Sequence, residues 1–220
     1  MNAIAINGSP RKRWNTALLL EKALLGARSL GAETELIHLY DLTYQGCISC
    51  FACKTRGSES FGKCAVADDL TPIFDRIEKA DLLIFGSPIY LGNVTGELRS
   101  FLERLVFQYL TYTDPPGSLF SRRIKTGIIY TMGVPEEAMA QLGYNQFLDS
   151  TEMFLTRIFG HSEALCCFDT LQFDDYSKYF APRFDPEQKM KRHEDVFPLD
   201  CRKAFELGQR LADACGARGK

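Results

Sequence analysis

Three short, almost continuously apolar runs, each followed by turn residues, constrain the fold of this chain most strongly. They cover residues 3–6, 81–85 and 126–130, and two weaker runs lie at 34–39 and 164–168. A helical pattern follows each of the three strong runs. Strands that are apolar along their whole length and alternate with helices indicate a parallel sheet covered on both faces. The sequence therefore predicts an α/β fold built on a doubly wound, five-stranded parallel sheet.

The expected helices have recognisable ends. Asn15 is a candidate cap for a helix that begins at Thr16, and Asp68 or Asp69 for a second helix before the third strand. The other expected helices cover 96–106, 135–159, and 185 to about 214, the last opened by Asp185 and a proline. Five strands with crossover helices match the flavodoxin-like form of the doubly wound sheet, for which we expect the strand order 2-1-3-4-5.

The balance of charge excludes some classes of partner. The chain has 26 Lys and Arg against 28 Asp and Glu, so its net charge is −2 and it offers no footprint for nucleic acid or an anionic membrane. The apolar start is too short for a signal peptide, and no apolar run approaches the roughly 18 residues that span a bilayer. We expect a cytoplasmic protein with one domain over 1–220. A cysteine-loop insertion at 45–67 and an aromatic-rich C-terminal segment at 171–184 interrupt the repeat.

The loop after the first strand has the composition of an anion site. It leads into a helix N-terminus, whose unpaired N–H groups and dipole attract negative charge. Ser9, Asn15 and Thr16 supply neutral donors, and Arg11 or Arg13 supplies charge. The alternative is an ordinary turn with a capping asparagine. The loop lacks G-x-G-x-x-G, so a dinucleotide bound in the Rossmann manner is not indicated.

The loop after the third strand suits a flat, partly apolar ring. Tyr90 and Leu91 can form an apolar wall, and the backbone around Gly92 and Asn93 can bind a polar edge. In a doubly wound sheet this loop and the loop from Thr131 emerge beside the anion loop. Residues 57–64 imitate a nucleotide-triphosphate loop, but they do not follow a strand, and a thiol replaces the hydroxyl that would bind Mg²⁺.

Three motifs in order resemble a known family. They are Ile-Asn-Gly-Ser-Pro-Arg, Cys-x-x-Cys-x-x-Cys and Gly-Ser-Pro-Ile-Tyr. Over about residues 1–170 the chain resembles the NADPH-dependent FMN reductases and iron–sulfur flavoproteins of the flavodoxin-like fold. The resemblance implies FMN and NAD(P)H, a homodimer or homotetramer, and an FMN phosphate on Ser9, Arg11, Asn15 and Thr16. It also implies a ring site on the second and third loops, made of Pro88, Ile89, Tyr90, Leu91, Gly92, Asn93, Thr131, Met132 and Gly133.

Four clustered cysteines are candidate metal ligands. Cys47, Cys50 and Cys53 have the compact spacing with which three thiolates can bind one iron–sulfur cluster. Cys64 follows after ten residues, a longer gap than in the iron–sulfur members of the family. A [4Fe–4S] cluster, a Cys₄ zinc site and free thiols all remain open. Because the loop follows the second strand, we expect its cysteines near the ring-binding edge of the sheet.

Conventional catalytic motifs are absent from the sequence, which has only three histidines and neither H-E-x-x-H nor G-x-S-x-G. A flavin carries its own redox chemistry, so no catalytic side chain is required. We expect an FMN-dependent oxidoreductase that passes electrons from NAD(P)H to a flavin, a quinone or another small acceptor. One alternative is an electron carrier with a [4Fe–4S] cluster and a redox-protein partner. The other is a binding protein of the same fold that senses redox state or metal.

Overall fold

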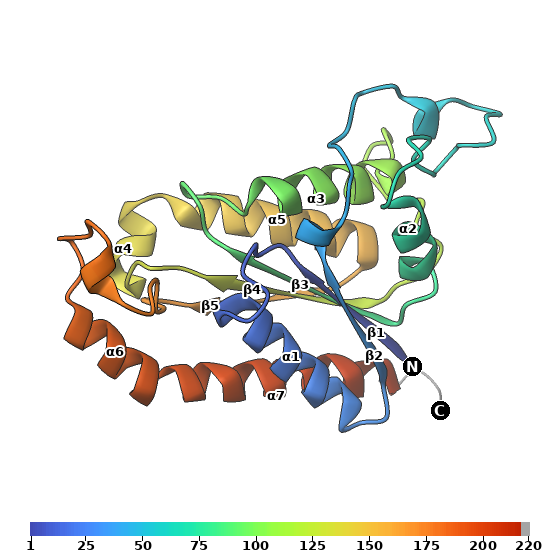
Figure 1. The fold of residues 1–220 in the computed structure, drawn as a ribbon. Helices are drawn as coiled ribbons and strands as arrows, with labels where there is room; N and C mark the ends of the chain where they lie inside the picture. The colour runs from blue at the N-terminus through green and yellow to red at the C-terminus, as the bar shows by residue number, and fades with distance from the viewer. Residues whose placement is uncertain (217–220) are drawn as a thin grey trace.

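The computed structural model describes residues 1–216 and contains one five-stranded parallel sheet (Figure 1). Its strands hydrogen-bond in the order β2-β1-β3-β4-β5, which confirms the expected flavodoxin-like topology. All four pairings are parallel. The strands are β1 (Asn2–Asn7), β2 (Glu33–His38), β3 (Leu82–Pro88), β4 (Lys125–Thr131) and β5 (Ser162–Cys167).

Helices cover both faces of the sheet. In Figure 1, α1 and α7 lie below the sheet, and α3 and α5 lie above it. The helices are α1 (Asn15–Arg28), α2 (Thr71–Ile77), α3 (Gly96–Tyr109), α4 (Glu136–Gln141), α5 (Tyr144–Phe159), α6 (Pro186–Asp195) and α7 (Phe197–Gly216). Short 3₁₀ turns are η1 (Leu39–Asp41), η2 (Ala52–Lys54) and η3 (Tyr176–Lys178). Among these described residues, no helix has the length and apolar character needed to cross a membrane.

The alternation of side chains along β1 divides the core into two layers. Ile4 and Ile6 pack in the layer of α2, α3 and α5, whereas Ala3 and Ala5 pack in the layer of α1 and α7. Successive strand residues point to opposite faces, so one apolar run serves both layers. The two alanines allow α1 to lie close to the sheet, which fixes the position of its N-terminus at the strand ends.

Two of the expected helices are each divided in two. Gly143, with a φ of +72°, separates α4 from α5 within the expected 135–159 helix. A left-handed residue cannot continue an α-helix, and glycine adopts this conformation without steric cost. Val196 separates α6 from α7 in the C-terminal segment. The expected start of that segment is confirmed, because the Asp185 carboxylate accepts from the backbone N–H groups of residues 187 and 188.

The expected caps of α1 and α2 are wrong. Asn15 is the first residue of α1 rather than its cap, and its side chain binds a distant carbonyl group. Helix α2 begins at Thr71 without a side-chain cap. One oxygen of the Asp68 carboxylate pairs with Arg104 and the other accepts from the Leu70 N–H at 3.0 Å, just before the helix, while the Asp69 carboxylate accepts from the backbone N–H of Thr43 at 2.6 Å. A long-range partner takes the side chain of Asn15 completely, whereas Asp68 divides its carboxylate between Arg104 and the start of α2.

Candidate functional site

The loop between β1 and α1, residues 8–14, is held rigidly at the carboxyl end of the sheet. The Asn7 side-chain oxygen accepts from the Ser9 N–H at 3.0 Å, and its amide nitrogen lies 2.8 Å from Nδ1 of His38. Gly8 has no room for a side chain, because a Cβ there would lie 2.7 Å from Cβ of Leu98. The Thr95 hydroxyl donates to the Gly8 carbonyl at 2.6 Å. These contacts fix the backbone that leads into α1.

Polar side chains are buried where α1 begins. Ser9, Asn15 and Thr16 are each at most 5% exposed. The Thr16 hydroxyl lies 2.8 Å from the Thr131 hydroxyl, which joins the first loop to the end of β4. The first α-helical hydrogen bond at this end runs from Leu18 N–H to the Trp14 carbonyl, so the geometry of the helix leaves earlier N–H groups able to donate to a ligand. This set of donors suits a compact anion.

The segment after β5 closes over this helix end. The Leu171 carbonyl accepts from the Trp14 indole N–H at 3.0 Å and from the Asn15 side-chain amide at 2.8 Å. The Arg11 guanidinium donates to the Gln172 carbonyl at 2.7 Å and lies 4.7 Å from the centroid of the Trp14 ring. Residues 171 and 172 therefore belong to the site, although they are more than 150 positions away in the sequence.

The loop after β3 forms a tight turn at residues 90–93. Tyr90 N–H donates to the Asn93 carbonyl at 2.8 Å, and Asn93 N–H donates back at 3.1 Å. Between them, Leu91 and Gly92 have φ values of +51° and +83°, as in a type I′ turn. The Leu91 side chain is fully exposed at the tip. A non-glycine residue held at positive φ is sparsely populated, and such strain concentrates at binding sites.

The loops predicted from the sequence meet around one cavity of about 60 Å³. Its volume is roughly that of two water molecules, so it can hold a group no larger than a compact anion. Ten of the fourteen predicted cofactor residues line it: Ser9, Arg11, Asn15, Thr16, Pro88, Ile89, Tyr90, Thr131, Met132 and Gly133. The remaining four, Arg13, Leu91, Gly92 and Asn93, lie outside its lining, and Arg13 is exposed.

The cysteine loop lies along α3 rather than at the strand ends. Figure 1 shows it beyond the C-terminal half of α3. The Lys54 ammonium donates to the carbonyl groups of Phe107, Gln108 and Leu110, which satisfies the C-terminal carbonyls of that helix. Cys64 contacts Arg104 and Gln108, roughly 12–18 Å along the helix from its first residue. The expected position at the ring edge is therefore wrong for most of the loop.

One cysteine is closer to the turn at residues 90–93. Cys47 and Ser49 share an apolar groove of about 290 Å³ with Asn93, between α3 and α5. All four clustered cysteines also line a second, small cavity of about 20 Å³, together with Arg104, Phe107 and Gln108. Within residues 1–216, no group of three or more His, Cys, Asp or Glu side chains is arranged to hold a metal ion. Burial raises the pKa of the Cys53 thiol, which therefore stays protonated unless a metal binds it.

Comparison with known families identifies the chain. The model of the family described as NADPH-dependent FMN reductase matches residues 1–155. The chain belongs to this family. Similar curated proteins include an iron–sulfur flavoprotein of Methanocaldococcus jannaschii, 40% identical over 104 residues, and one of Archaeoglobus fulgidus, 39% identical over 104 residues. Each match covers 47% of this chain, with 51% of the first relative and 48% of the second, so the chain spans about half the length of these relatives.

Solved structures share the fold of this FMN reductase family member over nearly its whole length. An NAD(P)H:quinone oxidoreductase from Methanothermobacter marburgensis superposes with a TM-score of 0.69 at 16% identity, covering 96% of this chain and 98% of that one. An azoreductase from Bacillus anthracis gives a TM-score of 0.66 at 14% identity, covering 96% and 99%. At these identities the likeness concerns the fold.

Sequence reasoning missed several residues of this FMN reductase family member. Trp14 lines the cavity at the start of α1, and as the only tryptophan of the chain it could have been singled out from the sequence. Residues 170–172 also line it, and the rule that ligands bind at carboxyl ends of strands could have included them. Arg104 and Gln108 had no such signal, because they lie within an ordinary amphipathic helix.

Proposed function

We propose that this chain is an FMN-dependent oxidoreductase that transfers electrons from NAD(P)H to a small acceptor such as a flavin or a quinone. The observation that carries the proposal is the single cavity in which the loops after β1, β3 and β4 meet at the start of α1. Membership of the NADPH-dependent FMN reductase family supports the same cofactor and reductant. The quinone oxidoreductase and azoreductase neighbours share the fold on which this activity would rest.

The phosphate of FMN would be bound by the start of α1. Ser9 and Thr16 offer buried hydroxyl groups, and the first turn of the helix offers N–H groups. Arg11 would supply positive charge at the rim, after leaving its contact with the Gln172 carbonyl. These residues neutralise and orient the anion, and the contacts of Asn7 and Gly8 keep the loop in place before the cofactor arrives.

The ring would lie over the turn at residues 90–93. Tyr90 and Leu91 present half-exposed and fully exposed apolar surface there, and the turn has backbone polar groups for the edge of the ring. Bound there, FMN would supply the hydride and electron chemistry that links NAD(P)H to the acceptor. The side chains of this chain need only bind and orient the two partners, which agrees with the absence of a catalytic triad from the sequence.

Titration with FMN tests this proposal. Thr16→Val removes one hydroxyl donor to a charged phosphate, and such a hydrogen bond contributes roughly 1.5–3 kcal/mol. The dissociation constant, followed by quenching of flavin fluorescence, should rise roughly 10- to 150-fold. Thr156→Val, on the exposed side of α5, is the matched control and should bind FMN like the parent. Equal affinity for both variants would remove Thr16 from the site, and parent protein that neither binds FMN nor oxidises NAD(P)H would refute the function.

A second candidate function is electron transfer through a [4Fe–4S] cluster on the cysteine loop. All four cysteines line one cavity, and the curated relatives are named iron–sulfur flavoproteins. In a [4Fe–4S] cluster each thiolate binds a separate iron, so the four sulfurs lie farther apart than around a single zinc ion. Four cysteines that are too widely spaced for one metal ion can therefore still bind a cluster. Iron analysis of protein made without oxygen should give about four irons per chain, reduced by Cys64→Ser. Iron-free protein with full NAD(P)H oxidation would leave the cysteines as thiols.

We also propose that residues 1–220 act as one domain and assemble as a homodimer or homotetramer in the cytoplasm. Two exposed apolar side chains support the assembly: Leu91, in the turn at residues 90–93, and Phe147, which lines the α3–α5 groove. Light scattering during gel filtration measures the mass directly. Phe147→Asp should reduce the mass to that of one chain, and a parent protein that already runs as a monomer would contradict the proposal.

A further inference from the structure

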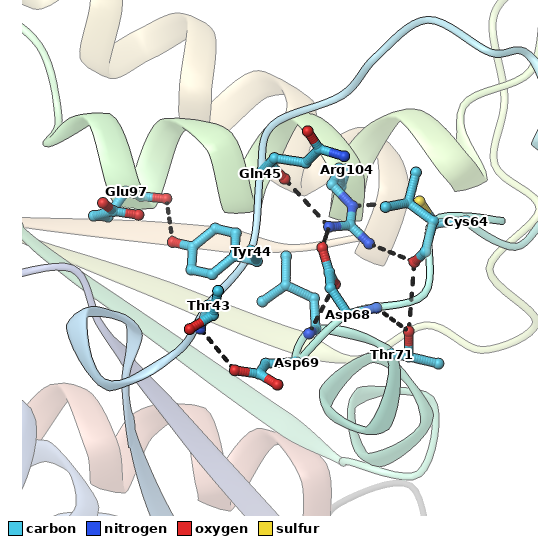
Figure 2. Close-up of polar contacts among 11 residues, drawn as sticks. Thr43, Tyr44, Gln45, Cys64, Asp68, Asp69, Thr71, Glu97 and Arg104 are labelled. Carbon is cyan, nitrogen blue, oxygen red and sulfur yellow. Dashed lines mark hydrogen bonds and ion pairs between the residues drawn. The ribbon is translucent and has the colours of Figure 1, made fainter.

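Arg104 ties the two ends of the cysteine loop to helix α3. Its side chain is completely buried. The guanidinium donates to the Gln45 carbonyl at 3.2 Å, before the cysteines, and to the Val66 carbonyl at 2.9 Å, after them. It also pairs with the Asp68 carboxylate, and its Nε donates to Sγ of Cys64 at 3.3 Å (Figure 2). A single buried cation thus holds the neck of the loop and contacts the sulfur of its last cysteine.

Gln108 lies one turn farther along the same face of α3 and contacts the same cysteine. Its side-chain oxygen accepts from the Cys64 N–H at 2.9 Å. Its amide nitrogen, Nε2, is buried without any hydrogen-bond partner, although the residue is only 3% exposed. Buried donors are nearly always paired, because an unpaired donor loses its hydrogen bonds to water without replacement. The unpaired amide therefore indicates an acceptor that belongs at this position.

The acceptor is identified by the cavity that Gln108 lines. Its lining residues include all four clustered cysteines and Arg104. Thiolates, and sulfide in a cluster, accept hydrogen bonds and carry negative charge, so an amide N–H and a guanidinium complement them. Lys54 fixes the other side of the cavity, since its ammonium binds the Gln108 carbonyl at 3.1 Å directly after Cys53. Helix α3 is thus a fixed support for both Cys53 and Cys64.

We propose that Arg104 and Gln108 are positioning residues for the cluster of the second candidate function, on which this inference rests. Arg104 holds Cys64 as the fourth ligand despite the ten-residue gap that precedes it. Gln108 donates its unpaired N–H to a sulfur of the cluster. Hydrogen bonds to sulfur and a nearby buried cation stabilise the more negative, reduced cluster, and both raise its reduction potential. The sequence spacing alone could not show this, because both residues come from a different element.

The test uses the full chain, loaded with iron and sulfide without oxygen, and measures iron per chain and the reduction potential. Gln108→Leu should keep four irons but lower the ratio of reduced to oxidised cluster about tenfold at a fixed mediator potential, which is ~59 mV for one electron. Arg104→Lys keeps the charge but cannot span both carbonyl groups, so iron should fall below four per chain while FMN binding and far-ultraviolet circular dichroism stay unchanged. Arg99→Met, which removes an exposed charge from the same helix, is the control and should change neither quantity.

The outcomes separate this inference from the cluster itself. Full iron with the parent potential in both Gln108→Leu and Arg104→Lys would overturn the roles of these residues and leave the cluster intact. Parent protein that binds FMN but no iron would overturn the cluster and this inference with it. A lower potential in Gln108→Leu alone supports the amide hydrogen bond, even if Arg104→Lys fails to fold.

Discussion

The contact between α1 and α7 gives the sharpest stability prediction, at Gly208. The two helices approach so closely that a Cβ at Gly208 would lie 1.8 Å from the carbonyl oxygen of Ala23, and one at Gly26 would lie 2.0 Å from that of Phe205. A carbon normally approaches a carbonyl oxygen no closer than about 3.3 Å. Gly208→Ala therefore forces the backbones apart by roughly 1.5 Å, since no flexible side chain is present to move.

The expected loss follows from two opposing terms. Overpacking a well-filled core costs typically about 1–3 kcal/mol, and the rigid backbone on both sides places this site at the upper end. Alanine regains nearly 1 kcal/mol of helix propensity relative to glycine. The net destabilisation is about 2 kcal/mol, which lowers the melting temperature of a domain of this size by roughly 4–8 °C.

Thermal unfolding followed by circular dichroism, without flavin, measures this change. Gly96→Ala is the matched control, because a Cβ there meets no atom within 4 Å, and its melting temperature should equal or exceed that of the parent. Because α1 carries Asn15 and Thr16, displacing the helix should also weaken FMN binding in Gly208→Ala. A melting temperature within 1 °C of the parent in that variant would refute the packing argument.

Three further predictions concern the site. Arg11→Ala should raise the dissociation constant of FMN by about 2- to 5-fold, the effect of an exposed charge at a helix N-terminus, whereas Lys12→Ala, whose ammonium pairs with a carboxylate, should not. Tyr90→Ala should lose more flavin on gel filtration than Tyr112→Ala, and equal retention would remove Tyr90 from the ring site. Burial lowers the pKa of His38 below 6.5, so the unfolded chain takes up a proton first. Stability to urea should therefore fall as the pH drops below 6.5, and His38→Gln should flatten that slope; an unchanged slope would contradict the assignment.

The strands could be predicted because burial on both faces leaves a local mark in the sequence. The apolar runs that became β1, β3 and β4 lie within one or a few residues of their observed bounds. The position of the first loop could be predicted as well, since Ser9 and Thr16 stand beside a strand end and a helix start. The positions of these strands and of this loop depend on residues adjacent in the sequence, so the local order of apolar and turn residues is enough to predict them.

Contacts between residues far apart in the chain could not be predicted from the sequence. Asn15 matched the preference for a capping residue, but the Leu171 carbonyl competes for its side chain from 156 positions away. Asp68 likewise gives one carboxylate oxygen to Arg104 and keeps only the other at the start of α2. The helix predicted across Gly143 failed for a different reason, because the apolar periodicity continues on both sides of a break that only the backbone conformation reveals. The errors at Asn15 and Asp68 concern polar side chains whose hydrogen-bond partners are set by the tertiary fold. The error at Gly143 concerns a backbone conformation that is set in the same way.

Arg104 brings the two ends of the cysteine loop together, so the loop could be removed without disturbing the sheet. The carbonyl groups of Gln45 and Val66 bind the same guanidinium, so the chain leaves and returns at nearly one point. Closing such a gap with a short turn adds no strain to β2 or α2, and shortening a loop changes its closure entropy only slowly. A chain lacking residues 46–65 should therefore still fold and bind FMN, and loss of FMN binding on that deletion would show that the loop supports the sheet. Residues 46–65 could therefore be transferred to a related protein of the same fold, provided that the recipient has an arginine and an aspartate equivalent to Arg104 and Asp68.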